Sequence, residues 1–215
     1  MGSEAGTELL RVASGALPPP EADLLGTLHR FTGRRLAAAW ACRGRLLDAL
    51  AAGNADAAEA ELHAFLRESW EVLDGLAREV NLCMVHLFPD AGLYPPFEMT
   101  RQCTFYVVRK KLHEQPDTAD HPVSRLLWER TREEPGEAYR RLSFLHNLSL
   151  FSTVPLLPGA LLPGSDDVPD AVRPLLKPAT VPRAEAGQTT DETLQWLADL
   201  CSAAYAILAG SLSGT

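Results

Sequence analysis

Residues 55–88 read ADAAEAELHAFLRESWEVLDGLAREVNLCMVHLF, and this stretch decides the fold. Its large apolar residues recur at steps of three or four, which is the period of an amphipathic α-helix. Gly53 and Asn54 stand directly before it and are typical of a turn. The sequence therefore predicts a long helix that follows a tight turn and buries one face. The apolar positions of that face are Leu62, Phe65, Leu66, Trp70, Leu73, Leu76, Val80, Met84 and Leu87.

A second amphipathic pattern precedes the turn. Between Glu21 and Leu50 the apolar residues again recur mostly every three or four positions. We therefore expect a helix over this range that pairs with residues 55–88 as an antiparallel hairpin. Residues 1–20 end in three consecutive prolines, which favour an extended chain, and they predict a flexible N-terminal lead-in.

Four further helices are predicted, with prolines between most of them. They cover residues 97–113, 123–133, 136–152 and 190–208, the last with Thr189 and Glu192 as a capping box. Residues 154–188 mix many prolines with leucines and valines, so we expect an irregular segment that wraps around the helices. No alternating strand pattern occurs. The sequence predicts an all-α, single-domain helical bundle of about six helices over residues 21–210, with the proline-rich segment before the last helix.

Composition favours a cytoplasmic globular protein. Of 215 residues, 46% are hydrophobic and 22% charged, and we expect neither a membrane span nor a secretory signal. The four cysteines are isolated, which predicts buried thiols in a reducing compartment. The net charge of −8 argues against acidic membranes and nucleic acid as partners. Seventeen arginines against three lysines fit a G+C-rich bacterial genome.

Strong catalytic motifs are missing from the sequence. It has no dinucleotide fingerprint, no phosphate-binding loop and no nucleophile elbow. None of the six histidines has a glutamate three residues before it, as carboxylate-bridged metal sites in helical bundles require. We therefore predict no cofactor and no bound metal, and the sequence leaves open whether the protein is an enzyme.

Polar residues in apolar helical segments give a candidate binding site. His146 and Asn147 interrupt residues 142–151, where six of ten residues are large and apolar. Burying such groups unpaired costs about 1–3 kcal/mol each, so they need partners from the protein, water or a ligand. Arg101 shares a helical face with Val108, and a core-facing arginine requires an anion. The candidate ligand-binding residues are Arg101, Glu98, Gln102, His86, Asn81, His146 and Asn147.

Two interpretations of these polar residues stay open. They form either a satisfied polar core or a small polar pocket. We favour the pocket, and therefore a helical binding or interaction module that takes a small polar or anionic ligand and could form a homo-oligomer.

Arg141 and His146 allow an alternative function. They have the Arg-x4-His spacing, within a predicted helix, that resembles the motif of HEPN-domain ribonucleases, which are also helical bundles. The resemblance implies that Arg141 and His146 would be the catalytic residues of a ribonuclease, or of another nucleic-acid-processing enzyme, that acts across a dimer.

Overall fold

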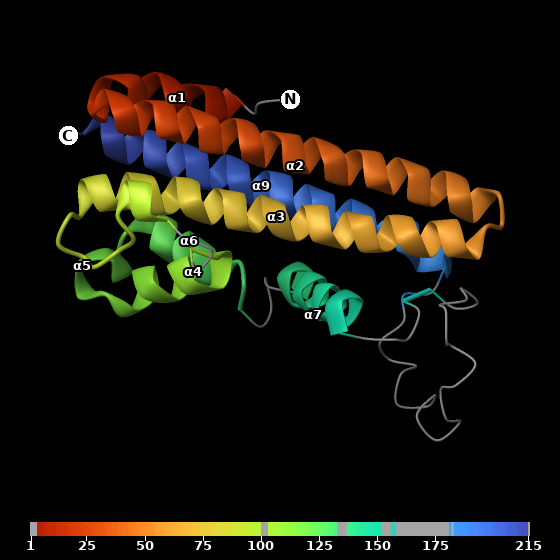
Figure 1. Ribbon diagram of the computed structural model, residues 1–215. Coiled ribbons are helices and arrows are strands. Elements are labelled where there is room, and N and C mark those ends of the chain that lie inside the picture. The colour runs from red at the N-terminus through yellow and green to blue at the C-terminus, as the bar shows by residue number, and fades with distance from the viewer. Residues whose placement is uncertain are drawn as a thin grey trace. The chain divides into compact units, whose positions relative to one another are not determined.

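The computed structural model describes residues 4–99, 103–132, 137–151, 156–157, 181 and 183–214. Within these ranges the chain is α-helical without a β-strand, so the predicted all-α class is confirmed (Figure 1). The described residues hold eight α-helices, two more than predicted, and one short 3-10 helix, η1. The bounds are α1 Glu4–Ala16, α2 Pro19–Ala51, α3 Ala55–Leu87, η1 Pro96–Glu98, α4 Phe105–Glu114, α5 Pro116–Ala119, α6 Pro122–Glu129, α7 Glu137–Phe151 and α9 Arg183–Ser213.

The chain divides into two compact units. Unit 1 comprises Met1–Arg35, Glu71–Glu137 and Trp196–Thr215, and unit 2 comprises Leu36–Trp70 and Ala138–Gln195. Unit 1 therefore contains α1, α4, α5 and α6, and unit 2 contains α7 from its second residue on. Both contain parts of α2, α3 and α9. The single domain of residues 21–210 stays a prediction.

The hairpin predicted around Gly53 is present. Helices α2 and α3 begin and end within two residues of the predicted positions. Gly53 has a φ of 70°, which glycine adopts without strain, and the Asn54 side chain accepts a hydrogen bond from the Ala57 amide at 3.1 Å. Contacts in each unit follow antiparallel order: Thr32 meets Glu79 in unit 1, and Arg45 meets Glu61 in unit 2.

The N-terminal lead-in differs from the prediction. Residues 4–16, expected to be flexible, form helix α1. Leu9, Ala13 and Leu17 recur every four residues and are all buried, so this short segment is held by packing. The prolines that follow do not extend the lead-in, because α2 begins at Pro19, and proline is tolerated in the first turn of a helix.

Two helix starts were predicted wrongly. The helix predicted from residue 97 starts at Phe105, whose amide donates a 2.8 Å hydrogen bond to Oδ1 of Asp74. The last helix starts at Arg183, so Thr189 lies inside it and forms no capping box. The hydroxyls of Thr190 and Thr193 instead donate to backbone carbonyls four residues earlier.

Smaller differences concern α5, α6 and the proline-rich segment. A predicted loop contains helix α5, and α6 ends at Glu129 rather than near residue 133. Most of residues 154–188 lies outside the described residues. Of its described parts, Val181 donates an amide hydrogen bond to the Leu156 carbonyl at 2.9 Å, and residues 183–188 belong to α9.

Helix α9 is unusual in its apolar character. Among the described residues it is the one helix, over Ala184–Ser213, that is long and apolar enough to span a membrane, with a mean hydropathy of 1.3. Half of its most apolar window is buried inside the protein. The core helix of a soluble protein has the same properties, so the composition of α9 alone is weak evidence for a membrane span.

Candidate ligand-binding site

Unit 1 contains an open groove of about 550 Å³. Residues from α1, from the last turn of α3 and from the end of α9 line it. Ligand-binding sites for small molecules typically have volumes of roughly 300–1,000 Å³, so the groove has a suitable size. Its lining residues are Arg11, Val12, Gly15, Ala16, His86, Leu212 and Ser213.

The sequence of α1 explains how the groove forms. Leu9 and Ala13 turn one face of α1 into the core, which leaves Arg11 and Gly15 on a neighbouring face. They are four residues apart and so lie one above the other. A Cβ atom at Gly15 would meet nothing within 4 Å, so the groove is open beside this residue. Small residues on α1 thus leave room beside the arginine.

Arg11 carries a charge at the groove. Its Nε and one terminal nitrogen donate to the carboxylate of Glu8 at 2.8 and 2.6 Å. These hydrogen bonds raise the pKa of Arg11 and lower the pKa of Glu8, so both side chains stay ionised. The side chains of Arg11 and Glu8 are 71% and 50% exposed, so water screens the pair and leaves it only weakly held. An anion in the groove could therefore compete with Glu8.

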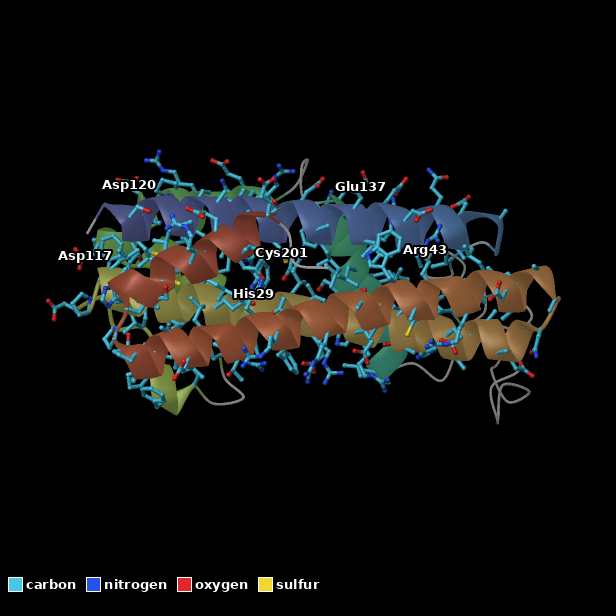
Figure 2. All side chains as sticks on the ribbon, turned by 90° about the horizontal axis from the view of Figure 1, so that it is seen from above. His29, Arg43, Asp117, Asp120, Glu137 and Cys201 are labelled. Carbon is cyan, nitrogen blue, oxygen red and sulfur yellow. The ribbon has the colours of Figure 1, made fainter. Side chains whose placement is uncertain are left out.

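A buried polar cluster lies deeper in unit 1 and centres on Glu79, which is 0% exposed. Its Oε1 accepts hydrogen bonds from the hydroxyls of Thr32 at 2.5 Å and Tyr205 at 3.1 Å. Its Oε2 lies 2.9 Å from Nδ1 of His29. A buried carboxylate needs such partners, and here they come from α2 and α9 while Glu79 lies on α3. We call Glu79, His29, Thr32 and Tyr205 the Glu79 cluster; His29 is labelled in Figure 2.

Gly75 and Cys201 lie beside the Glu79 cluster. A Cβ atom at Gly75 would lie 2.4 Å from the Thr32 hydroxyl oxygen, so only glycine lets α2 approach α3 this closely. Burial raises the pKa of Cys201, labelled in Figure 2, to about 12, and burial also raises the pKa of Tyr205 well above its ordinary value. Tyr205 therefore remains a protonated donor, and the thiol remains unreactive.

The Glu79 cluster and the groove share two helices. His86 follows Glu79 by seven residues on α3, and Leu212 follows Tyr205 by seven residues on α9. Seven residues are about two helical turns, so each pair lies on one face at a separation of roughly 10 Å along the axis. The cluster therefore fixes the relative position of α3 and α9, two of the three helices that line the groove.

The residues predicted to bind a ligand have different surroundings in unit 1. His86 lines the groove. Asn81 is buried, and its amide both donates to the Tyr94 carbonyl at 2.8 Å and accepts from the Tyr94 amide at 3.2 Å, so it holds the segment after α3. Glu98 ends η1, while its side chain, Arg101 and Gln102 lie outside the described residues.

His146 and Asn147 lie on α7 in unit 2. His146 is 8% exposed, and its ring stacks on Trp70 with ring centroids 4.7 Å apart and planes at 4°. Its Nδ1 atom is buried and has no hydrogen-bond partner within the described part of the chain. Burial lowers the pKa of His146, so its ring is neutral at neutral pH. Asn147 is exposed.

Arg141, the other residue of the ribonuclease alternative, also lies on α7. Its side chain is 37% exposed and donates to Oε2 of Glu192 at 2.9 Å within unit 2. Five residues along an α-helix correspond to a rotation of about 140°, so Arg141 and His146 leave α7 on different sides.

Sequence reasoning missed Arg11 and the Glu79 cluster. Arg11 fell in a segment expected to be flexible. Glu79 has a usable signal, because it stands among the apolar residues Leu76, Val80 and Cys83 of the buried side of α3. Its partners are 47 to 126 residues away in the sequence, which no local pattern reveals.

A metal-binding function has no support in the described residues, where no group of three or more histidine, cysteine, aspartate or glutamate side chains could hold an ion. Comparison with known proteins gives no match: no family model, no curated protein and no solved structure is significantly similar to this chain. A functional assignment must therefore come from the chemistry of the groove and its surroundings.

Proposed function

We propose that this protein is a helical binding module that takes a small anionic ligand in the groove of unit 1. The observation that carries this proposal is that Arg11 from α1 and His86 from α3 line the same groove. A guanidinium binds carboxylates and phosphates through two parallel hydrogen bonds, and an imidazole adds a further donor.

The rest of the groove suits a small organic anion. Val12, Ala16 and Leu212 provide apolar surface beside the two polar side chains. Mixed lining of this kind is usual for ligand sites, in which a few polar groups set the orientation of an otherwise apolar contact. The ligand would replace Glu8 as the partner of Arg11. The guanidinium would then donate to a carboxylate or phosphate of the ligand in place of the Glu8 carboxylate.

Compartment and source belong to the same proposal. All four cysteines are buried and free, which supports a reducing, cytoplasmic environment. The excess of arginine over lysine in the sequence supports a bacterial source.

A native mass spectrum of the purified protein would show a retained ligand as added mass and a homo-oligomer as a multiple of the chain mass.

The ribonuclease alternative with Arg141 and His146 has less support. The guanidinium of Arg141 is engaged by Glu192, and His146 is almost fully buried against Trp70. A catalytic histidine must reach the proton that it transfers. Cleavage of RNA by the purified protein, lost on replacing His146 by alanine, would favour this alternative over the binding module.

The binding proposal is tested by the effect of anions on the melting temperature. Phosphate, succinate and citrate would each be titrated against the parent, Arg11→Met, His86→Gln and Arg125→Met. The last is a matched control, because Arg125 forms an exposed ion pair with Asp120 and does not line the groove. A ligand at a hundred times its Kd should raise the parent's melting temperature by about 5–10 °C.

We expect that increase in Arg125→Met and not in Arg11→Met or His86→Gln. The proposal is wrong if none of the anions stabilises the parent. It is also wrong if all four proteins respond equally, because the anions would then act without the groove.

A further inference from the structure

Helix α4 presents an aromatic and basic face in unit 1 that is separate from the groove. Tyr106, Arg109, Lys110 and His113 follow one another at i, i+3, i+4 and i+7, so they share one side of the helix. Tyr106 is 52% exposed, and the side chain of Lys110 is 50% exposed. The opposite side, with Phe105, Val108 and Leu112, is buried. We call these four residues the α4 face.

Stacking contacts hold the α4 face in place. The Arg109 guanidinium carbon lies 5.5 Å from the ring centre of Tyr106 and 5.2 Å from that of Trp128 on α6. Arg109 also donates a hydrogen bond to the Thr131 hydroxyl. His113 stacks on Trp128 with ring centres 3.7 Å apart and planes at 12°. Arg109, His113 and the aromatic rings are therefore ordered before any partner arrives.

Tyr106 is the accessible aromatic ring of this arrangement. Trp128 is contacted by His113, Arg109 and also Arg132, whose guanidinium carbon lies 5.3 Å from its ring centre. Tyr106, in contrast, keeps about half of its surface in solvent with a guanidinium beside its ring. A rigid exposed ring next to cations is the combination with which proteins bind single-stranded nucleic acid, where bases stack and phosphates contact the cations.

We propose that the α4 face binds single-stranded nucleic acid, with a base stacked on Tyr106 and the adjoining phosphate contacting Lys110. Lys110 lies one turn from Tyr106, and its ion pair with Glu114 is a weak one at 3.7 Å between exposed groups. A phosphate can therefore replace Glu114. This site does not depend on the ligand of the groove.

Local charge allows such binding despite the net charge of −8. Residues 105–132 contain six lysines and arginines against four aspartates and glutamates, which leaves +2. Charges more than about 8 Å away are largely screened at physiological salt, so the nearby cations matter most. Few phosphates can be neutralised, so the affinity should be modest and fall as salt is added.

The test is fluorescence anisotropy with the full chain and a labelled 12-nucleotide RNA of mixed sequence, at low salt. Variants are Tyr106→Ala, Tyr106→Phe, Lys110→Gln and Phe144→Ala. Phe144 is the matched control, because it is 51% exposed on α7 in unit 2 and does not belong to the α4 face. Circular dichroism would verify that each variant is folded.

The parent and Phe144→Ala should bind the single strand equally, and Tyr106→Phe should bind nearly as well. Tyr106→Ala should bind about tenfold more weakly, as the loss of one stacked base predicts. Lys110→Gln should bind more weakly and with a smaller dependence on salt. A duplex of the same sequence should compete poorly, since its bases are already stacked.

Three results would overturn the proposal. The first is no binding of the single strand by the folded parent. The second is equal weakening by Tyr106→Ala and Phe144→Ala, and the third is a preference for the duplex. Because Arg11 and His86 are unchanged in all these variants, failure here would leave the anion-binding groove unaffected.

Discussion

The Nδ1 atom of His29 lies 2.9 Å from Oε2 of Glu79, a carboxylate that is completely buried. This contact joins α2 to α3 through two residues that are 50 positions apart in the sequence. Thr32 and Tyr205 occupy the other carboxylate oxygen, so the polar group is fully paired. Removing one member of such a buried, fully paired group is strongly destabilising, because the remaining polar groups are left without partners.

Replacing Glu79 by alanine should destabilise the protein strongly. The change leaves the hydroxyls of Thr32 and Tyr205 buried with fewer partners and removes the contact with His29. We expect a loss of roughly 2–4 kcal/mol in the free energy of unfolding, measured by urea denaturation. Glu114→Ala, at an exposed position of α4, should change it by less than about 0.5 kcal/mol. A loss in Glu79→Ala as small as that in Glu114→Ala would show that the cluster is unimportant for stability.

Two glycine substitutions should have opposite effects. Gly75→Ala places a methyl group against Thr32 and should destabilise by about 1–3 kcal/mol through overpacking. Gly33→Ala, also inside a helix, meets nothing within 4 Å and should stabilise by about 0.5–1 kcal/mol because alanine is the better helix former. Thermal unfolding of the two variants checks the signs. A stable Gly75→Ala protein would contradict the close approach of α2 to α3.

How far the sequence predicts the fold depends on the range of the interactions. Helices α2 and α3 were predicted almost to the residue because their periodicity and the turn at Gly53 are local. The start of α4 was not, because Asp74 receives the Phe105 amide from 31 positions away. Helix α1 was missed because a helix of 13 residues is only marginally stable by itself and is stabilised here by packing against the core.

The candidate site shows the same limit. His86 was selected from the sequence because it stands at the end of a long helix next to a loop, where sites usually form. Arg11, its neighbour in the groove, lies 75 positions earlier and has no motif to link the two. Tertiary proximity of this kind becomes visible only when the helices are placed in unit 1.

All four cysteines should be free thiols of low reactivity. Burial raises the pKa of Cys103 to about 11 and of Cys201 to about 12, so almost no thiolate is present at neutral pH. Titration with a thiol reagent should count four thiols in denaturant without reductant and should proceed slowly on the native protein. A count of two or none in denaturant would reveal disulfides and would contradict the cytoplasmic proposal.

Stability should fall in mildly acidic solution, and His146 should account for part of the fall. Burial against Trp70 lowers the pKa of His146 below its ordinary value of 6.5, so the unfolded chain binds a proton more readily than the folded chain. The contribution of His146 is therefore complete above about pH 6.5 and is lost as the pH falls toward its folded pKa. We expect a lower urea midpoint at pH 5.5 than at pH 7.5.

His146→Phe should reduce this difference, because it keeps an aromatic ring against Trp70 and removes the titrating group. The difference should not vanish, since burial also lowers the pKa of His121. Asn147→Ala, the exposed neighbour on α7, should behave like the parent. An unchanged difference in His146→Phe would mean that the histidine has the same proton affinity folded and unfolded, and that its buried Nδ1 has access to water.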